Sequence, residues 1–209
     1  MELETLDFSS LPIDVTVEKI VAGGFSACAL LNNGRIWTWG DTAGPDLANG
    51  TLLGRPTRNG VVKSPGEVGL IEPCIDISCS TYSCLAVTAS GGAYSWGDRD
   101  GNALGRMSDQ ADSEHDSLDA GTPTEVDGTA DVVISRGALS YTNGGVVTER
   151  GEVRVWGGAQ WKGGIGAGNE AAEVVRWQGV PACYACVDLL LAHRHAVLLF
   201  RKQGATVLI

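Results

Sequence analysis

GRIWTWGDTAG, residues 34–44, contains two tryptophans two positions apart, Trp37 and Trp39, followed directly by Gly40. Residues two apart share one face of a β-strand, so both indole rings are expected to point the same way. Glycine after the second tryptophan lets the chain turn without a Cβ penalty. A hydrophobic hairpin edge has the same pattern, so the fold depends on whether the segment recurs.

The Trp-Gly pair recurs at near-constant spacing, as Trp39-Gly40, Trp96-Gly97 and Trp156-Gly157. A similar lead segment precedes each pair, in IVAGGFSACALLNNG (20–34), ISCSTYSCLAVTASG (77–91) and VISRGALSYTNGGVVTERG (133–151). A third shared element follows each pair, in SPGEV (64–68), TPTEV (122–126) and AAEVV (171–175). Each unit thus has four short apolar runs separated by turn residues, which predicts a four-stranded antiparallel sheet.

Repeated four-stranded sheets stack around an axis as the blades of a β-propeller, with the tryptophans filling the space between sheets. VDLLLAHRHAVLLFRKQGATVLI (187–209) is interpreted as a fourth unit that lacks its outer strand, and LPIDV (11–15) as the strand that completes it. We therefore predict one all-β domain, a propeller of about four blades closed by pairing of residues 11–15 with residues 205–209. The expected blades are 16–68, 74–126, 131–175 and 186–209 plus 11–15.

At these residues the sequence resembles the regulator of chromosome condensation repeat family (RCC1-like β-propellers). The family unit runs G-x-x-H-x-x-A-L, then G-x-V-x-x-W-G, then G-Q-L-G-x-G. CSTYSCLAVTASGGAYSWGDRDGNALG (79–105) is most similar to it, and GGIGAG (163–168) is similar to its last element. Two departures stand out. The chain has four units where the family usually has seven blades, and Ser26 and Ser83 replace the histidine, which only His195 matches.

The family includes guanine-nucleotide exchange factors for a small GTPase, a plant ultraviolet-B receptor, enzyme-inhibiting binding proteins and scaffolds. The resemblance implies a binding module without catalytic chemistry. A light-sensing function like that of the plant receptor would require a cluster of tryptophans surrounded by arginines. Blade packing accounts for the three Trp-Gly tryptophans, which leaves Trp161 and Trp177 without an arginine-rich surround.

Composition limits the class of partner and the compartment. The 209 residues carry a net charge of −10, which argues against a general nucleic-acid binder because such a protein needs a basic face. The first ten residues lack the pattern of a signal peptide, and no apolar run reaches membrane-spanning length. We expect a soluble intracellular protein, in cytoplasm or nucleus, with its six cysteines reduced.

Candidate chemical sites have simpler structural explanations. CYAC (183–186) and HRH (193–195) contain the residue types that bind zinc, but we interpret them as buried thiols and a turn. Cys28, Cys79 and Cys84 are interpreted as core residues. His115 lies in a polar loop without a nucleophile elbow. DRDGN (98–102) lacks the further ligands of a calcium loop. We therefore expect no enzyme activity, no cofactor and no metal site.

The loop 98–121 is the strongest candidate for a contact surface. Long loops on a rigid scaffold often carry binding function. This loop has seven acidic residues against two basic ones, Arg99 and Arg106, and the acids are Asp98, Asp100, Asp109, Asp112, Glu114, Asp116 and Asp119. A solvated loop kept soluble by charge is the alternative explanation.

The predicted function is a protein-interaction or scaffold module in a larger assembly, with a basic partner surface and no direct binding to nucleic acid or membrane. Nucleotide exchange on a small GTPase and histone or chromatin association remain as alternatives. A homodimer that shares blade closure also remains open. The nearly neutral loop 41–63, with Arg55, Arg58 and Lys63, is the second candidate for a contact surface.

Overall fold

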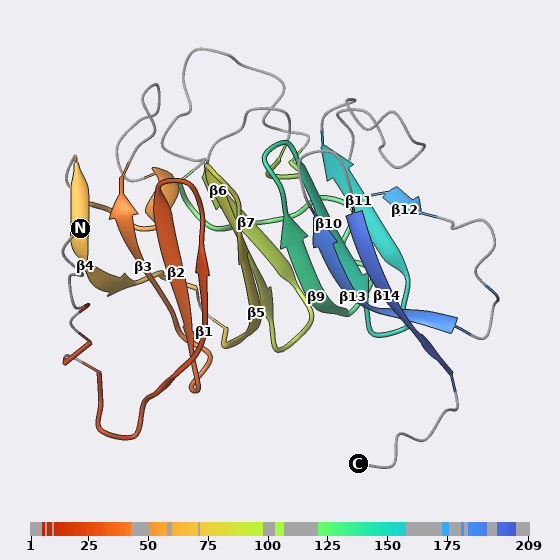
Figure 1. The fold of residues 1–209 in the computed structure, drawn as a ribbon, viewed down its shortest axis with the longest axis horizontal. Helices are drawn as coiled ribbons and strands as arrows, with labels where there is room; N and C mark the ends of the chain where they lie inside the picture. Colours follow the sequence, from red (N-terminus) through yellow and green to blue (C-terminus); the bar gives the residue numbers. More distant parts are fainter. Residues whose placement is uncertain are drawn as a thin grey trace.

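A computed structural model describes residues 6, 8–9, 11–42, 51–57, 60–70, 72–97, 103–106, 121–157, 173–175, 181, 184–191 and 196–203. These residues form an all-β structure in which antiparallel sheets follow one another in chain order (Figure 1). The first three sheets have four strands each, and the fourth has two among the described residues. The predicted all-β class and the four-stranded units are thereby confirmed.

Within each of the first three sheets, each strand pairs with the next one along the chain. The first sheet comprises β1 (Val17–Ala22), β2 (Ser26–Leu31), β3 (Ile36–Asp41) and β4 (Val61–Glu67). The second comprises β5 (Cys74–Cys79), β6 (Ser83–Thr88), β7 (Ala93–Gly97) and β8 (Thr124–Glu125). The third comprises β9 (Ile134–Leu139), β10 (Asn143–Thr148), β11 (Val153–Gly157) and β12 (Glu173–Val175). The fourth pairs β13 (Tyr184–Leu191) with β14 (Ala196–Lys202).

Apolar cores hold neighbouring sheets together. Leu30 and Ile36 of the first sheet pack against Ile77 and Trp96 of the second. The second sheet in turn packs on the third through a cluster of Leu85, Val87, Ala93, Val126, Ile134, Leu139, Val146 and Trp156. The third sheet meets the fourth through Ala138, Val147, Val153, Val155, Cys186 and Leu189. The sheets therefore pack in chain order, and Figure 1 shows the first sheet on the left and the fourth sheet overlapping the third on the right.

The glycine of each Trp-Gly pair has a backbone reason to be glycine. Gly40, Gly97 and Gly157 have φ angles of 119°, 121° and 120°, a region that residues with a Cβ rarely adopt. A Cβ at Gly97 would also clash with the carbonyl oxygen of Tyr82 in the preceding turn. The same clash recurs at Gly40 and Gly157. The glycine therefore allows the third strand to end directly against the turn between the first two strands.

Each internal tryptophan packs on a loop of the preceding sheet. Trp96 lies against Gly54, which follows the 3-10 helix η1 (Thr51–Leu53), and Trp156 lies against Gly105. Trp156 also donates its indole N–H to the carbonyl oxygen of Ala103 at 2.8 Å. Trp39, in the first sheet, instead meets Phe8, whose ring lies edge-on with centroids 5.7 Å apart. Phe8 therefore covers the tryptophan before which the described residues form no sheet.

Residues 11–15 do not form the predicted outer strand. Turns occupy this segment, and the Val15 N–H donates to the Pro12 carbonyl oxygen at 3.0 Å. This local hydrogen bond belongs to a turn, so the structure does not show the predicted strand, and the closure stays a prediction. Its other end, residues 205–209, lies outside the described residues.

The prediction that all cysteines are reduced is also wrong. The structure joins Cys79 and Cys84 in a disulfide, with Cα atoms 4.2 Å apart. The two residues are directly opposed in the β5–β6 hairpin, which is the register that brings side chains closest. Of the described cysteines, Cys28, Cys74 and Cys186 are free and buried.

Candidate functional site

Aromatic side chains lie at corresponding turns of three consecutive sheets. Phe25 lies in the β1–β2 turn, Tyr82 in the β5–β6 turn and Tyr141 in the β9–β10 turn. The Phe25 and Tyr82 rings stack with centroids 5.1 Å apart, and Tyr141 meets Tyr82 edge-on at 5.7 Å. Phe25 is 39% exposed and Tyr141 is 44% exposed. These three residues form a continuous, partly exposed surface, which we call the aromatic row.

The turns that carry the aromatic row share one backbone geometry. The N–H of Gly23, Ser80 and Ser140 donates to the carbonyl oxygen three residues later, at 2.7 Å in each case. Phe25 and Tyr82 are the third residues of their turns, whereas Tyr141 is the second. In a tight turn of four residues the two central side chains lie outside the paired strands, so they project beyond the strand ends.

The long connections leave from this same edge. Gly40 pairs with Ser26, Gly97 with Ser83 and Gly157 with Asn143, so each third strand ends beside a turn of the aromatic row. Figure 1 shows these turns and strand ends along its upper edge. The chain therefore enters the connection that contains 98–121 next to Tyr82.

Arginines anchor two of these connections to the sheets. Arg55 donates from Nη2 to the Thr38 carbonyl oxygen at 2.9 Å, and Thr38 donates its hydroxyl to the Leu53 carbonyl oxygen at 2.7 Å. In the second sheet Arg106 donates to the carbonyl oxygens of Ser95 and Thr122. Burial lowers the pKa of Arg55. Neither guanidinium is therefore a free surface charge, which removes Arg55 from the second candidate surface.

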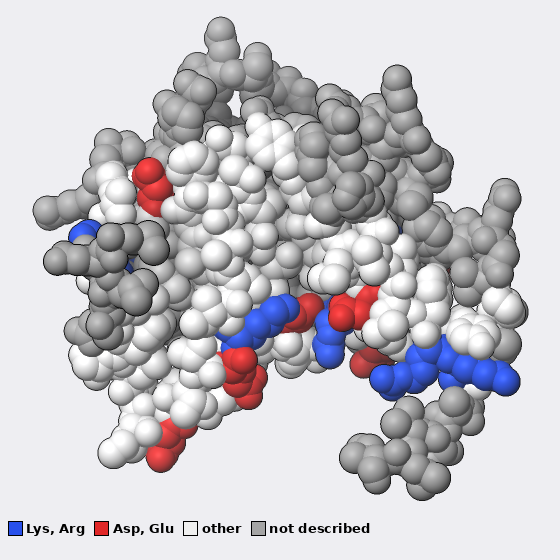
Figure 2. Space-filling model, viewed as in Figure 1, with Lys and Arg blue, Asp and Glu red and all other residues white. Residues whose placement is uncertain are grey.

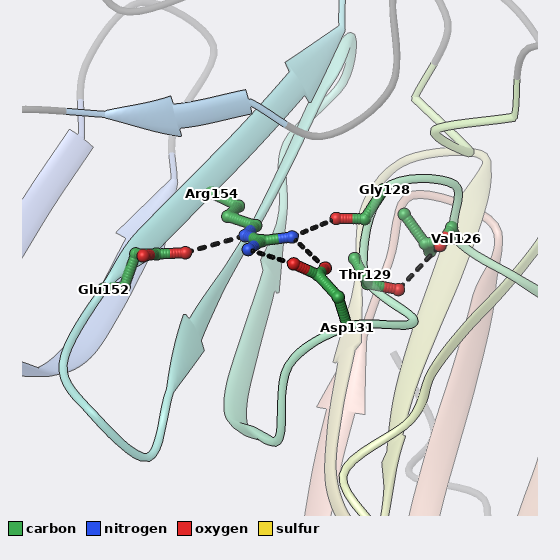
Figure 3. Close-up of polar contacts among 6 residues, drawn as sticks. All are labelled: Val126, Gly128, Thr129, Asp131, Glu152 and Arg154. Atoms are coloured by element: carbon green, nitrogen blue, oxygen red, sulfur yellow. Dashed lines mark hydrogen bonds and ion pairs between the residues drawn. The ribbon is translucent and has the colours of Figure 1, made fainter.

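On the opposite edge of the third sheet, Arg154 joins β11 to the connection between β8 and β9 (Figure 3). Its guanidinium contacts both carboxylate oxygens of Asp131, at 2.6 and 3.1 Å, and its Nε donates to Glu152 at 2.8 Å. It also donates to the Gly128 carbonyl oxygen. The hydrogen bond from Arg154 lowers the pKa of Asp131, and the pKa of Arg154 is raised by the same bond.

We call Arg154 and its partners Asp131, Glu152 and Gly128 the Arg154 clamp. A pocket of about 250 Å³ lies beside it, and its lining includes Asp131, Thr148, Arg150 and Glu152. Two of its carboxylates, Asp131 and Glu152, are already paired with Arg154. The single guanidinium balances one of these two carboxylates, so the arrangement ties β11 to the connection before β9 and leaves one net negative charge among the three groups.

The free thiols are suited to packing rather than to reaction. Burial raises the pKa of Cys74 to about 11 and also raises the pKa of Cys28 and Cys186. A thiol needs a lowered pKa to act as a nucleophile or a metal ligand near neutral pH. Within the described part of the chain, no three His, Cys, Asp or Glu side chains gather where they could hold a metal ion.

The acids predicted to form the contact surface all lie outside the described residues, as do His115, Trp161, Trp177, Cys183, His193 and His195. The structure thus places Trp39, Trp96 and Trp156 at corresponding positions of successive sheets, and the acidic residues of loop 98–121 lie outside the described residues. In the described segments, no helix is long and apolar enough to cross a bilayer.

Two features were missed from the sequence although it contains a signal for each. LLGR (52–55) and ALGR (103–106) share the Leu-Gly-Arg that packs on the next tryptophan and returns an arginine to the sheet. Phe25-Ser26 and Tyr82-Ser83 likewise repeat an aromatic residue before the serine that opens the second strand. Aligning the whole repeat units residue by residue shows both.

Comparisons with known proteins agree with this geometry. The model of the regulator of chromosome condensation (RCC1) repeat matches residues 17–42, which span β1 to β3. The mitochondrial RCC1 domain-containing protein RUG3 of Arabidopsis thaliana is 29% identical over 150 residues, which are 71% of this chain and 30% of that protein. The mouse E3 ubiquitin-protein ligase HERC2 is 28% identical over 138 residues, 65% of this chain and 2% of that protein.

Solved structures show a similar fold at low sequence identity. Human WBSCR16 has a TM-score of 0.73 and 21% identity, over 91% of this chain and 46% of that chain. Prp20p of Saccharomyces cerevisiae has a TM-score of 0.72 and 18% identity, over 88% of this chain and 41% of that chain. The chain thus spans less than half the length of these proteins. The chain is therefore similar in sequence to the RCC1 repeat and to an RCC1 domain-containing protein, and it shares its fold with the solved structures.

Proposed function

We propose that this chain is a protein-interaction module that binds a basic segment of a partner on the edge that carries the aromatic row. The observation that carries the proposal is the continuity of Phe25, Tyr82 and Tyr141 across three sheets, with two of the rings more than one-third exposed. Exposed aromatic rings on a rigid scaffold are typical anchors of protein interfaces.

The charge of the neighbouring loop indicates the chemistry of the partner. Loop 98–121 has seven acids, and one of its two arginines, Arg106, is buried and bound to backbone carbonyls. The loop starts next to Tyr82, because Gly97 is paired with Ser83. Acidic side chains beside aromatic faces favour lysine and arginine, which gain both ion pairing and cation–π contact.

The similar proteins support protein binding in general. Yeast Prp20p has binding properties toward Gsp1p and histones, and a second structure shows Kap60 bound to yeast RCC1 (Prp20). RCC1-like proteins are in general binding or exchange factors, so we propose no catalytic role for this chain. Nucleotide exchange and histone association remain the two alternatives to the scaffold role. Intracellular localisation stays a prediction.

The test compares partner capture by three purified proteins, with bound proteins identified by mass spectrometry and then measured individually for affinity. The Phe25→Ser/Tyr82→Ser/Tyr141→Ser variant should lose a partner that the unmodified chain binds. Tyr184→Ser is the matched control, because Tyr184 is equally exposed but begins β13 at the opposite edge. Unchanged affinity in the triple variant contradicts the proposal.

The identity of the captured protein distinguishes the alternatives. A single small GTPase supports nucleotide exchange, histones support a chromatin role, and a multi-subunit complex supports the scaffold role. Circular dichroism melts of all three purified proteins check that lost binding does not reflect lost folding.

A further inference from the structure

A disulfide closes the hairpin that carries the central ring of the aromatic row. Cys79 ends β5 and is bonded to Cys84 of β6, and residues 80–83 between them form the turn that contains Tyr82. The Tyr82 ring contacts both other rings of the row. The disulfide therefore lies at the base of the turn on which the continuity of the aromatic row depends.

The corresponding turns of the two neighbouring sheets close without a disulfide. The directly opposed residue pairs that flank these turns are Ala22–Ala27 in the first sheet and Leu139–Gly144 in the third. All three turns nevertheless have the same backbone hydrogen bond of 2.7 Å. The disulfide is therefore not needed to form this kind of turn.

Hydrogen bonds other than the disulfide hold the turn of the second sheet. Ser80 donates its N–H to the Ser83 carbonyl oxygen, and Ser83 donates its N–H to Ser80 Oγ at 3.2 Å. The two hydroxyl groups are also hydrogen-bonded to each other, at 2.8 Å. Opening the disulfide is therefore expected to shift this turn and not to unfold it.

The two bonded cysteines differ in exposure. Cys84 is 1% exposed and belongs to the core between the first and second sheets. Cys79 is only partly buried and packs against that core from its edge. Exposed disulfides are the ones that thiols reduce most readily. A reductant therefore approaches this bond from the side of Cys79.

We propose that a dithiol reductant opens the Cys79–Cys84 disulfide and thereby weakens binding on the aromatic row. This inference rests on the function proposed above, to which it adds redox regulation. One thiolate of the reductant attacks Cys79 Sγ and forms a mixed disulfide, while the electron pair of the broken S–S bond leaves with Cys84 Sγ, which takes up a proton. The second thiol of the reductant then displaces Cys79 as a thiol. Two electrons and two protons pass from the reductant, which becomes a cyclic disulfide.

Reduction separates two sulfur atoms that the bond holds together. Thiol sulfur atoms that are no longer bonded move apart to van der Waals contact, well beyond the about 2.0 Å of an S–S bond. Cys79 and Cys84 are directly opposed, with Cα atoms 4.2 Å apart, so the hairpin has to widen at this point. Close packing in the core fixes Cys84, so Cys79 and the turn after it take up the displacement.

The turn of the second sheet lies directly against the turn of the first. A Cβ added at Gly23 would overlap the carbonyl oxygen of Ser80, and one added at Gly24 would overlap the Thr81 side chain. Because this contact has no free space, a shift of the second turn changes the spacing between the rings of the aromatic row. Figure 2 shows that the described atoms near this upper edge are mostly uncharged, so contact there depends on where the rings lie.

Proton NMR of the chain tests the structural step without a partner. The Tyr82 ring is stacked on Phe25 in the oxidised chain, with 15° between the ring planes, so its proton shifts should change when dithiothreitol is added. The ring of Tyr184, at the start of β13, should not respond. Circular dichroism checks that the reduced chain stays folded. Unchanged Tyr82 shifts in the reduced, folded chain overturn the inference.

Binding of an oligoarginine peptide, as a model of a basic segment, tests the functional step. Reduction by dithiothreitol should raise its dissociation constant at least about fivefold, the effect of losing one aromatic contact of moderate strength. An unchanged dissociation constant overturns the redox inference alone, provided that the Phe25→Ser/Tyr82→Ser/Tyr141→Ser variant loses binding. If that variant binds like the unmodified chain, or the oxidised chain does not bind the peptide, the proposed function fails and the inference fails with it.

Cysteine variants assign the response to this disulfide. Cys79→Ala/Cys84→Ala gives the second sheet the alanine pair found in the first, so it should bind the peptide equally with and without dithiothreitol. Cys186→Ala is the matched control, because it removes a free buried thiol of the fourth sheet and should keep the full response. A response that persists in the double variant, or that disappears in the control, overturns the inference.

Discussion

At the residue scale, the tryptophans of the repeat act as packing residues between sheets. Trp156 is buried in the core between the second and third sheets and donates its N–H to Ala103. Trp156→Ala removes this hydrogen bond and leaves a cavity, so we expect a loss of about 3–5 kcal/mol in the free energy of unfolding. Urea denaturation monitored by circular dichroism measures it. A loss below about 1 kcal/mol contradicts the inter-sheet role.

Comparing alanine substitutions at Gly97 and Gly60 distinguishes backbone strain from steric overlap. Its φ of 121° is unfavourable for alanine, and a Cβ would clash with the Tyr82 carbonyl oxygen. Gly60 has a φ of 103° but open space around the Cβ position, so Gly60→Ala carries the strain alone. We expect Gly97→Ala to lower the melting temperature more than Gly60→Ala. Equal shifts would mean that the close approach to the Tyr82 turn is unimportant.

The contact between Arg154 and Asp131 makes the stability of the fold depend on pH. The hydrogen bond from Arg154 lowers the pKa of Asp131 below its ordinary value of 3.8, so the pair stabilises the fold above pH 3.8. This stabilisation is lost as pH falls through the lowered pKa, because the native carboxylate then takes up a proton. Asp131→Asn should therefore melt below the unmodified chain at pH 6, and the difference should shrink below pH 3.8. A difference independent of pH contradicts this assignment.

At the scale of elements, the sequence predicts the repeat because each of the first three sheets contains the same sequence features. Trp-Gly endings, lead segments and the later Glu-Val pairs each recur three times, which sufficed to predict three four-stranded sheets. Residues 11–15 share the Pro-x-acid-Val pattern of an outer strand, yet a local turn takes the Val15 N–H. Sequence pattern does not report this competition between local and long-range hydrogen bonds.

Strand register is a feature that the sequence alone leaves open. One bulged residue shifts which side chain faces a neighbour, so the equivalence of Lys19 on β1 and Asp188 on β13 became visible only with the strand pairing. The disulfide was missed for the same reason. A spacing of five residues says little until the hairpin places Cys79 directly opposite Cys84.

The disulfide yields a prediction for the β5–β6 hairpin. Peptide mapping without reductant should find Cys79 linked to Cys84, and Cys28 and Cys74 should resist alkylation until the chain unfolds, because both thiols are buried. Reducing the bond should cost about 2 kcal/mol of unfolding free energy, near the low end for disulfides, because the loop is short. Rapid alkylation of Cys79 in the native, unreduced chain contradicts the assignment.

At the scale of the whole molecule, one edge of the sheet row combines rigid aromatic anchors with the start of an acidic loop. Exposed carboxylates add little to folding stability, but they speed encounter with a basic surface and fix its orientation. The loop and the aromatic row should therefore affect binding far more than folding. This separation distinguishes a contact surface from a loop that only keeps the chain soluble.

The most direct test is the affinity for a captured partner, measured at low and high salt, of the unmodified chain and of the Asp109→Asn/Asp112→Asn/Glu114→Gln/Asp116→Asn variant. The account predicts an unchanged melting temperature, weaker binding by the variant at low salt, and convergence of the two affinities as salt screens charges beyond about 8–10 Å. Equal affinities that ignore both the substitutions and the salt would contradict it, and the loop would then serve only solubility.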